Sequence, residues 1–196
     1  SGILRKISNW NVSVNNWDVS NATNLYSLFF QTSYNQPLNS WNTSNVTNMA
    51  SLFSTTTFNQ DISSWDVSKV TSMNSMFNNV QTFDQDISGW DVSNVENMAS
   101  AFQKTALTAD ISGWDVSKVT SMTNMLREVD EFNVDISGWN TVSNTSLMFT
   151  FYHSNLFNQN LSNWNILSIT TADRCFYTTN MSTANYTDTI VGWAVQ

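Results

Sequence analysis

Tryptophan recurs along this chain at an almost constant spacing, and no other feature constrains the fold as strongly. Seven tryptophans follow one another at intervals of 24, 24, 25, 24, 25 and 25 residues: Trp17, Trp41, Trp65, Trp90, Trp114, Trp139 and Trp164. Self-similarity at a fixed period in this range is the signature of a solenoid, in which each repeat packs against its neighbours. The 196 residues are therefore expected to form one elongated unit rather than two domains.

Apolar residues keep fixed positions relative to each Trp, while the residues between them vary among Ser, Thr, Asn and Lys. In residues 58–77, FNQDISSWDVSKVTSMNSMF, Phe stands seven positions before the Trp and again twelve after it. Ile stands three positions before it, Val five after and Met eight after. Charged residues make up 11% of the chain, against about 25% in typical globular proteins. We expect the apolar positions to form one continuous core.

Each repeat is predicted to contain a short strand and a short helix. Val70, Met73 and Phe77 lie at i, i+3 and i+7, which is one face of a helix, and Ser68 is well placed as its N-cap. We expect a short strand near residues 60–63, because two helices and two turns barely fit into 24 residues. An all-helical solenoid is the alternative.

The chain divides into three parts at this level. We expect a truncated repeat that caps the N-terminal end (1–16), the repeat array (17–163), and a degenerate last repeat with a C-terminal cap (164–196). In the last part, Ile190 and Trp193 keep the Ile-to-Trp spacing and also fit one face of a helix. No signal peptide is visible, so any such segment is expected to have been removed or to lie outside this sequence.

Composition argues against several classes of function. The net charge is −8 and the seven Lys and Arg residues are scattered, whereas nucleic-acid binding needs a basic stripe. No apolar run is long enough for direct membrane insertion. Cys175 takes a core position, which predicts a buried thiol, and nothing places the single histidine, His153, beside it. We expect no enzyme activity, no cofactor and no metal centre.

A polar ladder is the candidate ligand-facing site. It combines the positions four and six residues before the Trp: Asn59, Asp61, Asp84, Asp86, Asp110, Asn133, Asp135, Asn158 and Asn160. Stacked carboxylates repel, so each Asp is expected to accept hydrogen bonds from a neighbouring turn. The alternative is a ligand or Ca²⁺ site, since Ca²⁺ takes six to eight oxygens.

Two other polar columns have simpler interpretations. A second acidic column directly follows the Trp and is expected to form turns or to face a helix dipole: Asp18, Asp66, Asp91 and Asp115. A Thr column would suit ice binding, but we expect it on the helix, which disfavours that function: Thr23, Thr47, Thr71 and Thr120.

The motif FNQDISxWDVSxVTxMxxMF, taken from residues 58–77 and closely repeated at 83–102, resembles the DUF285 repeats of BspA-like leucine-rich-repeat surface proteins. The resemblance covers nearly the whole chain, from about Trp10 to Trp193. It implies an α/β repeat fold, a right-handed leucine-rich-repeat-like solenoid of about seven 24–25-residue units. It also implies a non-enzymatic protein at the cell surface or outside the cell, acting in adhesion.

Two functions from different classes follow from this pattern. The first is an extracellular or cell-surface module that binds a protein or a glycan on another surface through its strand-lined face. The second is a structural spacer or self-assembling component of a surface layer, filament or virion, whose partners are copies of itself. Lateral self-association distinguishes them.

Overall fold

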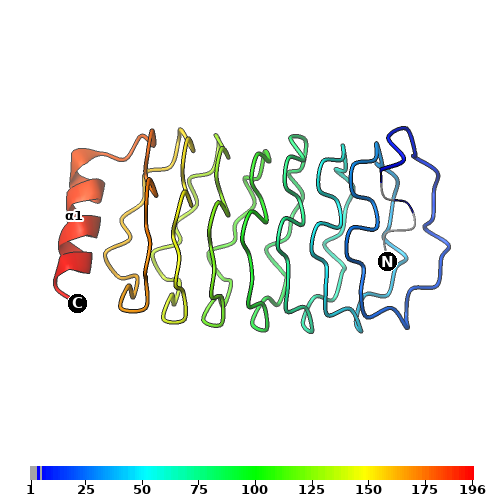
Figure 1. The fold of residues 1–196 in the computed structure, drawn as a ribbon, viewed down its shortest axis with the longest axis horizontal. Helices are drawn as coiled ribbons and strands as arrows, with labels where there is room; N and C mark the ends of the chain where they lie inside the picture. Colours follow the sequence, from blue (N-terminus) through cyan, green and yellow to red (C-terminus); the bar gives the residue numbers. More distant parts are fainter. Residues whose placement is uncertain (1–3, 5) are drawn as a thin grey trace.

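The chain winds into coils that lie side by side along the long axis of an elongated molecule (Figure 1). The structure is a computed structural model and describes residue 4 and residues 6–196. Its only helix within these residues is α1, Thr183–Ala194, and it has no strand there. Parallel pairing occurs only as isolated bridges: Asn24–Asn48, Asn48–Ser72, Ser72–Asn97, Asn97–Ser121 and Ser146–Thr171. The protein is thus a mostly non-helical repeat domain held together by contacts between residues distant in sequence.

Backbone hydrogen bonds between neighbouring coils take the place of a helix or a sheet. In one coil, the N–H groups of Met73, Ser75, Phe77 and Asn79 donate to the next coil over 2.8–3.0 Å, to Asn97 O, Ala99 O, Ala101 O and Gln103 O. Between them, the N–H groups of Met76 and Asn78 close four-residue turns by donating to Met73 O and Ser75 O. Each earlier and later coil up to residue 153 repeats this alternation.

In the stretch that donates these bonds, two residues four positions apart have positive φ. Ser75 has a φ of 56° and Asn79 of 58°. A residue in the left-handed conformation ends a turn of helix, so the four-residue turns cannot join into a continuous helix. The alternate N–H groups remain available to the next coil.

Both elements predicted for each repeat are therefore wrong. Residues 70–77 are not helical, because the amides that bond there do so three residues back or to a neighbouring coil rather than four residues back. Residues 60–63 form no strand, and the parallel bridge lies in the other half of the repeat, at Ser72. The all-helical alternative is wrong as well. Ser68 is no N-cap, since its N–H donates to Asp66 Oδ1 over 2.9 Å.

The predicted core positions are confirmed in the middle of the array, whereas Trp17, the first Trp of its column, is 42% exposed. Phe58, Ile62 and Phe77 are fully buried, and Trp65 is 3% exposed. The indole N–H of Trp65 donates to Leu38 O of the preceding coil over 3.2 Å. The Trp of every later repeat makes the same bond, so this column supplies both apolar volume and a hydrogen bond between coils.

The two ends of the array are covered differently. Lys6 donates its N–H to Phe30 O over 2.9 Å, and Leu4 is buried; residues 1–3 and 5 of the predicted cap lie outside the described residues. At the other end lies α1 (Figure 1), whose Trp193 donates its indole N–H to Leu161 O over 2.8 Å. Trp193 thus takes the role of a repeat Trp from within a helix. No helix in the described part of the chain has the length and apolarity needed to cross a membrane.

Cys175 and Asn144 are buried at positions of the apolar columns. Cys175 is buried as predicted, and burial raises the pKa of its thiol to about 12. Asn144 takes a position that Val holds in four other repeats, and it is fully buried. Its Oδ1 accepts the N–H of Ser146 over 3.0 Å, but its Nδ2 has no partner among the residues described.

Replacing Trp90 should show how much one member of the Trp column stabilises the fold. We expect Trp90→Ala to lower the free energy of unfolding by about 3–5 kcal/mol, since it leaves a cavity and removes the indole hydrogen bond to Ile62 O. Trp90→Phe should lower it by about 1–2 kcal/mol, the cost of the lost N–H. Urea denaturation followed by circular dichroism measures both. Gly89→Ala is the control, because an added Cβ there meets nothing within 4 Å; equal effects of Trp90→Ala and this control would contradict the stacked core.

Asn144→Val should raise the free energy of unfolding by about 1–2 kcal/mol, because it removes an unpaired buried amide. The same denaturation experiment measures the gain. The reverse exchange in the preceding repeat, Val119→Asn, should destabilise by about 1–3 kcal/mol. Loss of stability in Asn144→Val would mean that the bond to Ser146 outweighs the unpaired Nδ2.

Candidate functional site

The predicted ligand-facing ladder consists of two columns with different roles. In the column six residues before the Trp, the side-chain oxygen accepts a backbone N–H from the next coil. Asn59 Oδ1 accepts from Asp84 N (3.1 Å) and Asp84 Oδ1 from Thr108 N (2.7 Å). Asn133 and Asn158 do the same over 2.8 Å. These side chains therefore join neighbouring coils.

The column four residues before the Trp lies in exposed turns. Each Oδ1 accepts the N–H of the Ser two residues on, over 2.9–3.0 Å: Asp61, Asp86, Asp110, Asp135 and Asn160. The hydrogen bonds thus come from the residue's own turn, not from a neighbouring one as expected. They lower the pKa of all four carboxyl groups, while Asp86 opposes this at Asp61 by repulsion.

The second acidic column forms turns, as predicted. Asp18, Asp66, Asp91 and Asp115 each accept the N–H of the Ser two residues on. Within residues 4 and 6–196, no three His, Cys, Asp or Glu side chains come together to hold a metal ion. A shallow hollow of about 360 Å³ lies over Asp84, Asp86 and Asp110. Binding of a ligand by the ladder remains a prediction.

In each repeat we call the segment with the parallel bridge and the coil-to-coil backbone bonds the bridged stretch, for example residues 71–79. The Thr column lies on this stretch rather than on a helix, so the structural reason for disfavouring ice binding is wrong. Thr47 donates its N–H and its hydroxyl to Thr23 O over 2.8 and 3.1 Å, and Thr71 repeats this with Thr47 O. Glu96 interrupts the column. These exposed hydroxyls therefore serve contacts between coils, in a single, broken column.

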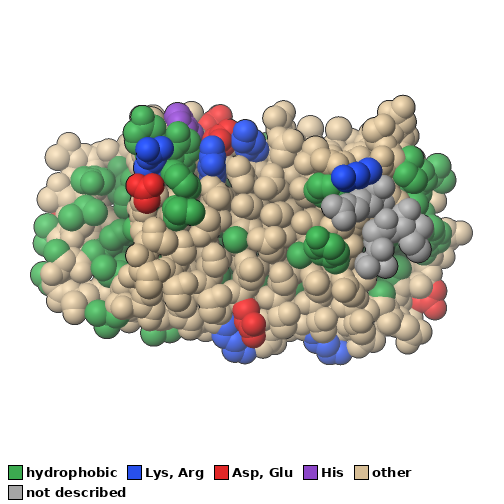
Figure 2. Space-filling model, viewed as in Figure 1, with side chains coloured by type: hydrophobic (Ala, Val, Ile, Leu, Met, Phe, Trp, Pro, Cys, Tyr) green, Lys and Arg blue, Asp and Glu red, His purple; other side chains and the backbone are tan. Residues whose placement is uncertain are grey.

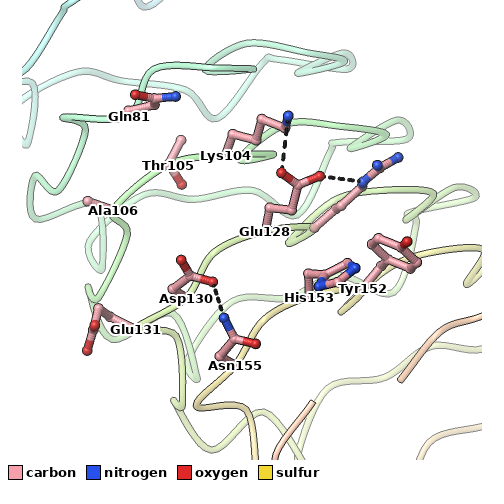
Figure 3. Close-up of a pocket in the computed structure, with 11 residues that line it drawn as sticks. Gln81, Lys104, Thr105, Ala106, Glu128, Asp130, Glu131, Tyr152, His153 and Asn155 are labelled. Carbon is pink, nitrogen blue, oxygen red and sulfur yellow. Dashed lines mark hydrogen bonds and ion pairs between the residues drawn. The ribbon is translucent and has the colours of Figure 1, made fainter. Parts of the chain in front are cut away.

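The surface departs from this regularity at one edge of the molecule. Figure 2 shows the histidine there, beside hydrophobic side chains and charges of both signs. A groove of about 760 Å³ is open at this place, and we call it the charged groove (Figure 3). Its lining comes from consecutive coils: Gln81, Lys104, Thr105, Ala106, Arg127, Glu128, Asp130, Glu131, Tyr152, His153 and Asn155.

Glu128 holds two cations in the groove. Its carboxylate lies 3.1 Å from Lys104 Nζ and 3.0 Å from Arg127 Nε. Partial burial raises the pKa of Glu128, but hydrogen bonds and attraction from Lys104 and Arg127 outweigh it, and the pKa is lowered. Asn155 Nδ2 donates to Asp130 Oδ1 over 2.8 Å on the other side (Figure 3). Cations that are scattered in the sequence thus meet in the fold.

Aromatic rings flank these ion pairs. The guanidinium carbon of Arg127 lies 4.8 Å from the ring centroid of Tyr152, within cation–π distance. Tyr152 stacks on Tyr177 with 5.2 Å between centroids, and His153 meets Tyr152 edge-on at 4.3 Å. Phe149 packs edge-on against Tyr152 at 5.4 Å. The groove therefore combines flat apolar faces with charges and amides.

The backbone beneath the groove is fixed by the bonds between coils. Lys104 N donates to Arg127 O, Glu128 N to Tyr152 O, and His153 N to Tyr177 O, over 2.8–2.9 Å. Lys104, Glu128 and His153 occupy a positive-φ position that Gln31 and Thr55 hold in earlier coils. The groove side chains thus project from a stretch whose conformation does not depend on them.

The groove was not predicted, although the sequence carries a signal for it. Its residues fall just after the Phe that stands twelve positions after the Trp, where two earlier repeats have the small polar pairs Ser54–Thr55 and Asn78–Asn79. The pairs Arg127–Glu128 and Tyr152–His153 depart from that pattern. This segment also varies in length: four residues separate Phe53 from Phe58, and five separate Leu126 from Phe132.

Comparison with known proteins identifies one family. The family model described as "Mycoplasma protein of unknown function, DUF285" matches residues 1–108 and again residues 102–195. The two matches run in tandem and together cover nearly the whole chain. No curated protein and no solved structure matches this sequence.

The exposed Asp turns should make stability depend on acid. Because hydrogen bonds lower the folded pKa below the usual 3.8, these turns stabilise the fold above the unfolded pKa, and that contribution is lost as the pH falls through the folded pKa. We expect the free energy of unfolding to be flat between about pH 5 and 8 and to decline below about pH 4. Urea denaturation across this range measures it.

The variant that replaces Asp61, Asp86, Asp110 and Asp135 by Asn is the matched comparison. Asn160 shows that Asn accepts the same turn hydrogen bond, so the variant should fold and should lose part of the acid-dependent decline. Asp18, Asp66 and Asp115, whose pKa values are also lowered by turn hydrogen bonds, keep the remainder. An unchanged decline would assign the acid sensitivity to other groups.

Proposed function

The chain belongs to the DUF285 family, and on that basis we propose that it is a non-enzymatic surface module that binds a protein or a glycan in adhesion. We further propose that its coils are those of a right-handed, leucine-rich-repeat-like solenoid of the BspA-like type. Rigid stacked repeats offer long surfaces suited to extended partners. The place of action is the cell surface or the outside of the cell, including the surface of a virion.

The charged groove is the observation that supports binding. Its volume of about 760 Å³ falls in the range of about 300–1,000 Å³ typical of ligand sites. Tyr and Arg are the residues that contribute most at recognition surfaces, and Tyr, Ser and Asn together are typical of paratopes. Here Tyr152, Arg127 and Asn155 stand on a fixed backbone, so little conformational entropy is lost when a partner binds.

The chemistry of the groove narrows the class of partner. Lys104 and Arg127 are both engaged by Glu128, and Asp130 and Glu131 add two more carboxylates. A polyanion such as nucleic acid finds no free basic stripe there. A sugar or a peptide, with polar groups around an apolar face, is complementary to the stacked Tyr152 and Tyr177.

The alternative function is a structural spacer or a self-assembling component. The observation in its favour is the uniformity of the remaining surface, where turns such as Asp61–Ser63 and Asp86–Ser88 repeat in five successive coils. Such a role needs no groove, and its partners are copies of the chain. Sizing by light scattering across a concentration range separates it from adhesion.

Tyr152→Ala should abolish binding if the groove is the adhesive site. We expect wild-type protein to bind selected members of an array of glycans and extracellular-matrix proteins, and the variant to lose about tenfold or more in affinity, as for a hot-spot residue. Asn78→Ala is the matched control, because Asn78 holds the same position in an earlier coil, and it should bind as wild type does.

A second variant tests the ladder against the groove. Asp61, Asp86, Asp110 and Asp135 are changed together to Asn, and melting temperatures confirm that all variants fold. Loss of binding here with full binding by Tyr152→Ala would place the site on the ladder. A folded wild type that binds nothing on the array would favour the structural role.

A further inference from the structure

The last coil carries a row of backbone donors without acceptors. In every earlier coil, the four alternate N–H groups of the bridged stretch donate to the next coil, as Leu147, Phe149, Phe151 and His153 do to Thr171 O, Asp173 O, Cys175 O and Tyr177 O. In the last coil the equivalent groups belong to Ala172, Arg174, Phe176 and Thr178. Within the described residues none of these four N–H groups donates a hydrogen bond.

The helix α1 covers only the other half of this end. Leu161 N donates to Thr189 Oγ1 over 2.9 Å, and Trp193 Nε1 donates to Leu161 O. Gly192 lies so close to Ser162 that a Cβ added to Gly192 would lie 2.5 Å from the Cβ of Ser162. These contacts hold α1 against residues 158–166, so the half from Ala172 onwards stays open.

An apolar cleft lies between the open half and α1. It has a volume of about 430 Å³, and its apolar lining includes Cys175, Phe176, Ile190 and Trp193. Phe176 is only partly buried, whereas Phe151, its equivalent in the preceding coil, is fully buried. Ile190 is 40% exposed on α1. The Phe176 ring meets Trp193 and Tyr186 of α1 at 5.7 and 6.3 Å between centroids, and the cleft opens beside these rings and the row of free N–H groups.

From this arrangement we propose that the end of the array binds an extended peptide of another polypeptide, parallel to the last coil. Its alternate carbonyl groups accept the N–H groups of Ala172, Arg174, Phe176 and Thr178. Its apolar side chains, spaced three to four residues apart as Met73 and Phe77 are, fill the cleft. The peptide would thus bind as a further coil would, with the same hydrogen-bonding and apolar positions that join every pair of coils. This resembles the addition of a strand to the open edge of a sheet.

A peptide fits this edge better than a second copy of the chain. The coil that a copy would have to present is its first, because that coil alone has no coil before it. There Lys6 already donates to Phe30 O, and the Trp10 ring lies 5.9 Å from the Phe29 ring. The N-terminal residues therefore occupy part of the face that a stacked copy would need.

The probe is a peptide of the chain's own repeat, SKVTSMNSMFNNV, residues 68–80. We expect saturable binding by fluorescence anisotropy, and slower hydrogen exchange at the four open amides when the peptide is present. A peptide carrying M73S, M76S and F77S is the control probe and should not bind. Lys104→Ala should bind the peptide normally, because Lys104 lines the charged groove and no part of the cleft.

Two variants of the protein test the geometry. Ala172→Pro removes one donor N–H that makes no internal bond, and Ile190→Asp places a charge in the cleft. Each should weaken binding about fivefold or more, the effect of one lost hydrogen bond or of a buried charge. Val191→Asp, which is on α1 at a position 56% exposed and outside the cleft lining, is the control and should bind as wild type does.

Several outcomes would overturn the proposal. They are no saturable binding by the folded protein, equal binding of the two peptides, and equal binding by Ile190→Asp and Val191→Asp. Concentration-dependent self-association that Ile190→Asp removes would show that a second copy occupies the edge instead. Slow exchange at the four amides in the free protein would show that the chain itself covers them.

Discussion

The rest of the structure depends on the hydrogen bonds that run from each coil to the next. A single coil has neither a continuous helix nor a strand, so its alternate amides find acceptors only about 24 residues away, as from Met73 to Asn97 O. The Trp indoles, which donate to the preceding coil, and the Asn side chains six positions earlier, which accept from the next coil, add further bonds between the same neighbours. Each coil is therefore stable only between neighbours, and stability is a property of adjacent pairs. The ends are the exceptions, and each needs a different solution.

The core was predictable from the sequence because burial depends on spacing alone. Val70, Met73 and Phe77 point inward whether the backbone between them is helical or a series of four-residue turns. The backbone was not predictable for the same reason: i, i+3 and i+7 fit both conformations. The left-handed conformation at Ser75 and Asn79 decides between the two backbones. A Ser or an Asn does not predict this conformation as strongly as a Gly does. Helix α1 was recognisable because Ile190 and Trp193 satisfied a helix and the repeat at once.

The polar surface was predictable in its periodicity but not in its roles. A column of Asn or Asp looks the same in sequence whether it faces a ligand or bonds the next coil, and Asn59 and Asn133 bond the next coil. The charged groove escaped prediction because it arises from three coils that depart from the pattern, and Lys104, Glu128 and Tyr152 are distant in sequence. Their proximity follows from the stacking, which brings residues about one period apart side by side. Departures from the repeat consensus thus indicate a candidate binding surface, as the consensus itself indicates the core.

The segment that carries the groove is also the one whose length changes between repeats. The period is either 24 or 25 residues, and the extra residue falls between the two Phe columns, outside the bridged stretch and the Trp column. Insertions and new side chains there do not alter the bonds between coils. Duplication of a repeat would therefore add a constant frame together with one freely varying segment. An array built this way can diversify what it recognises at one edge, coil by coil, while inheriting its fold unchanged, much as hypervariable loops do on a fixed framework.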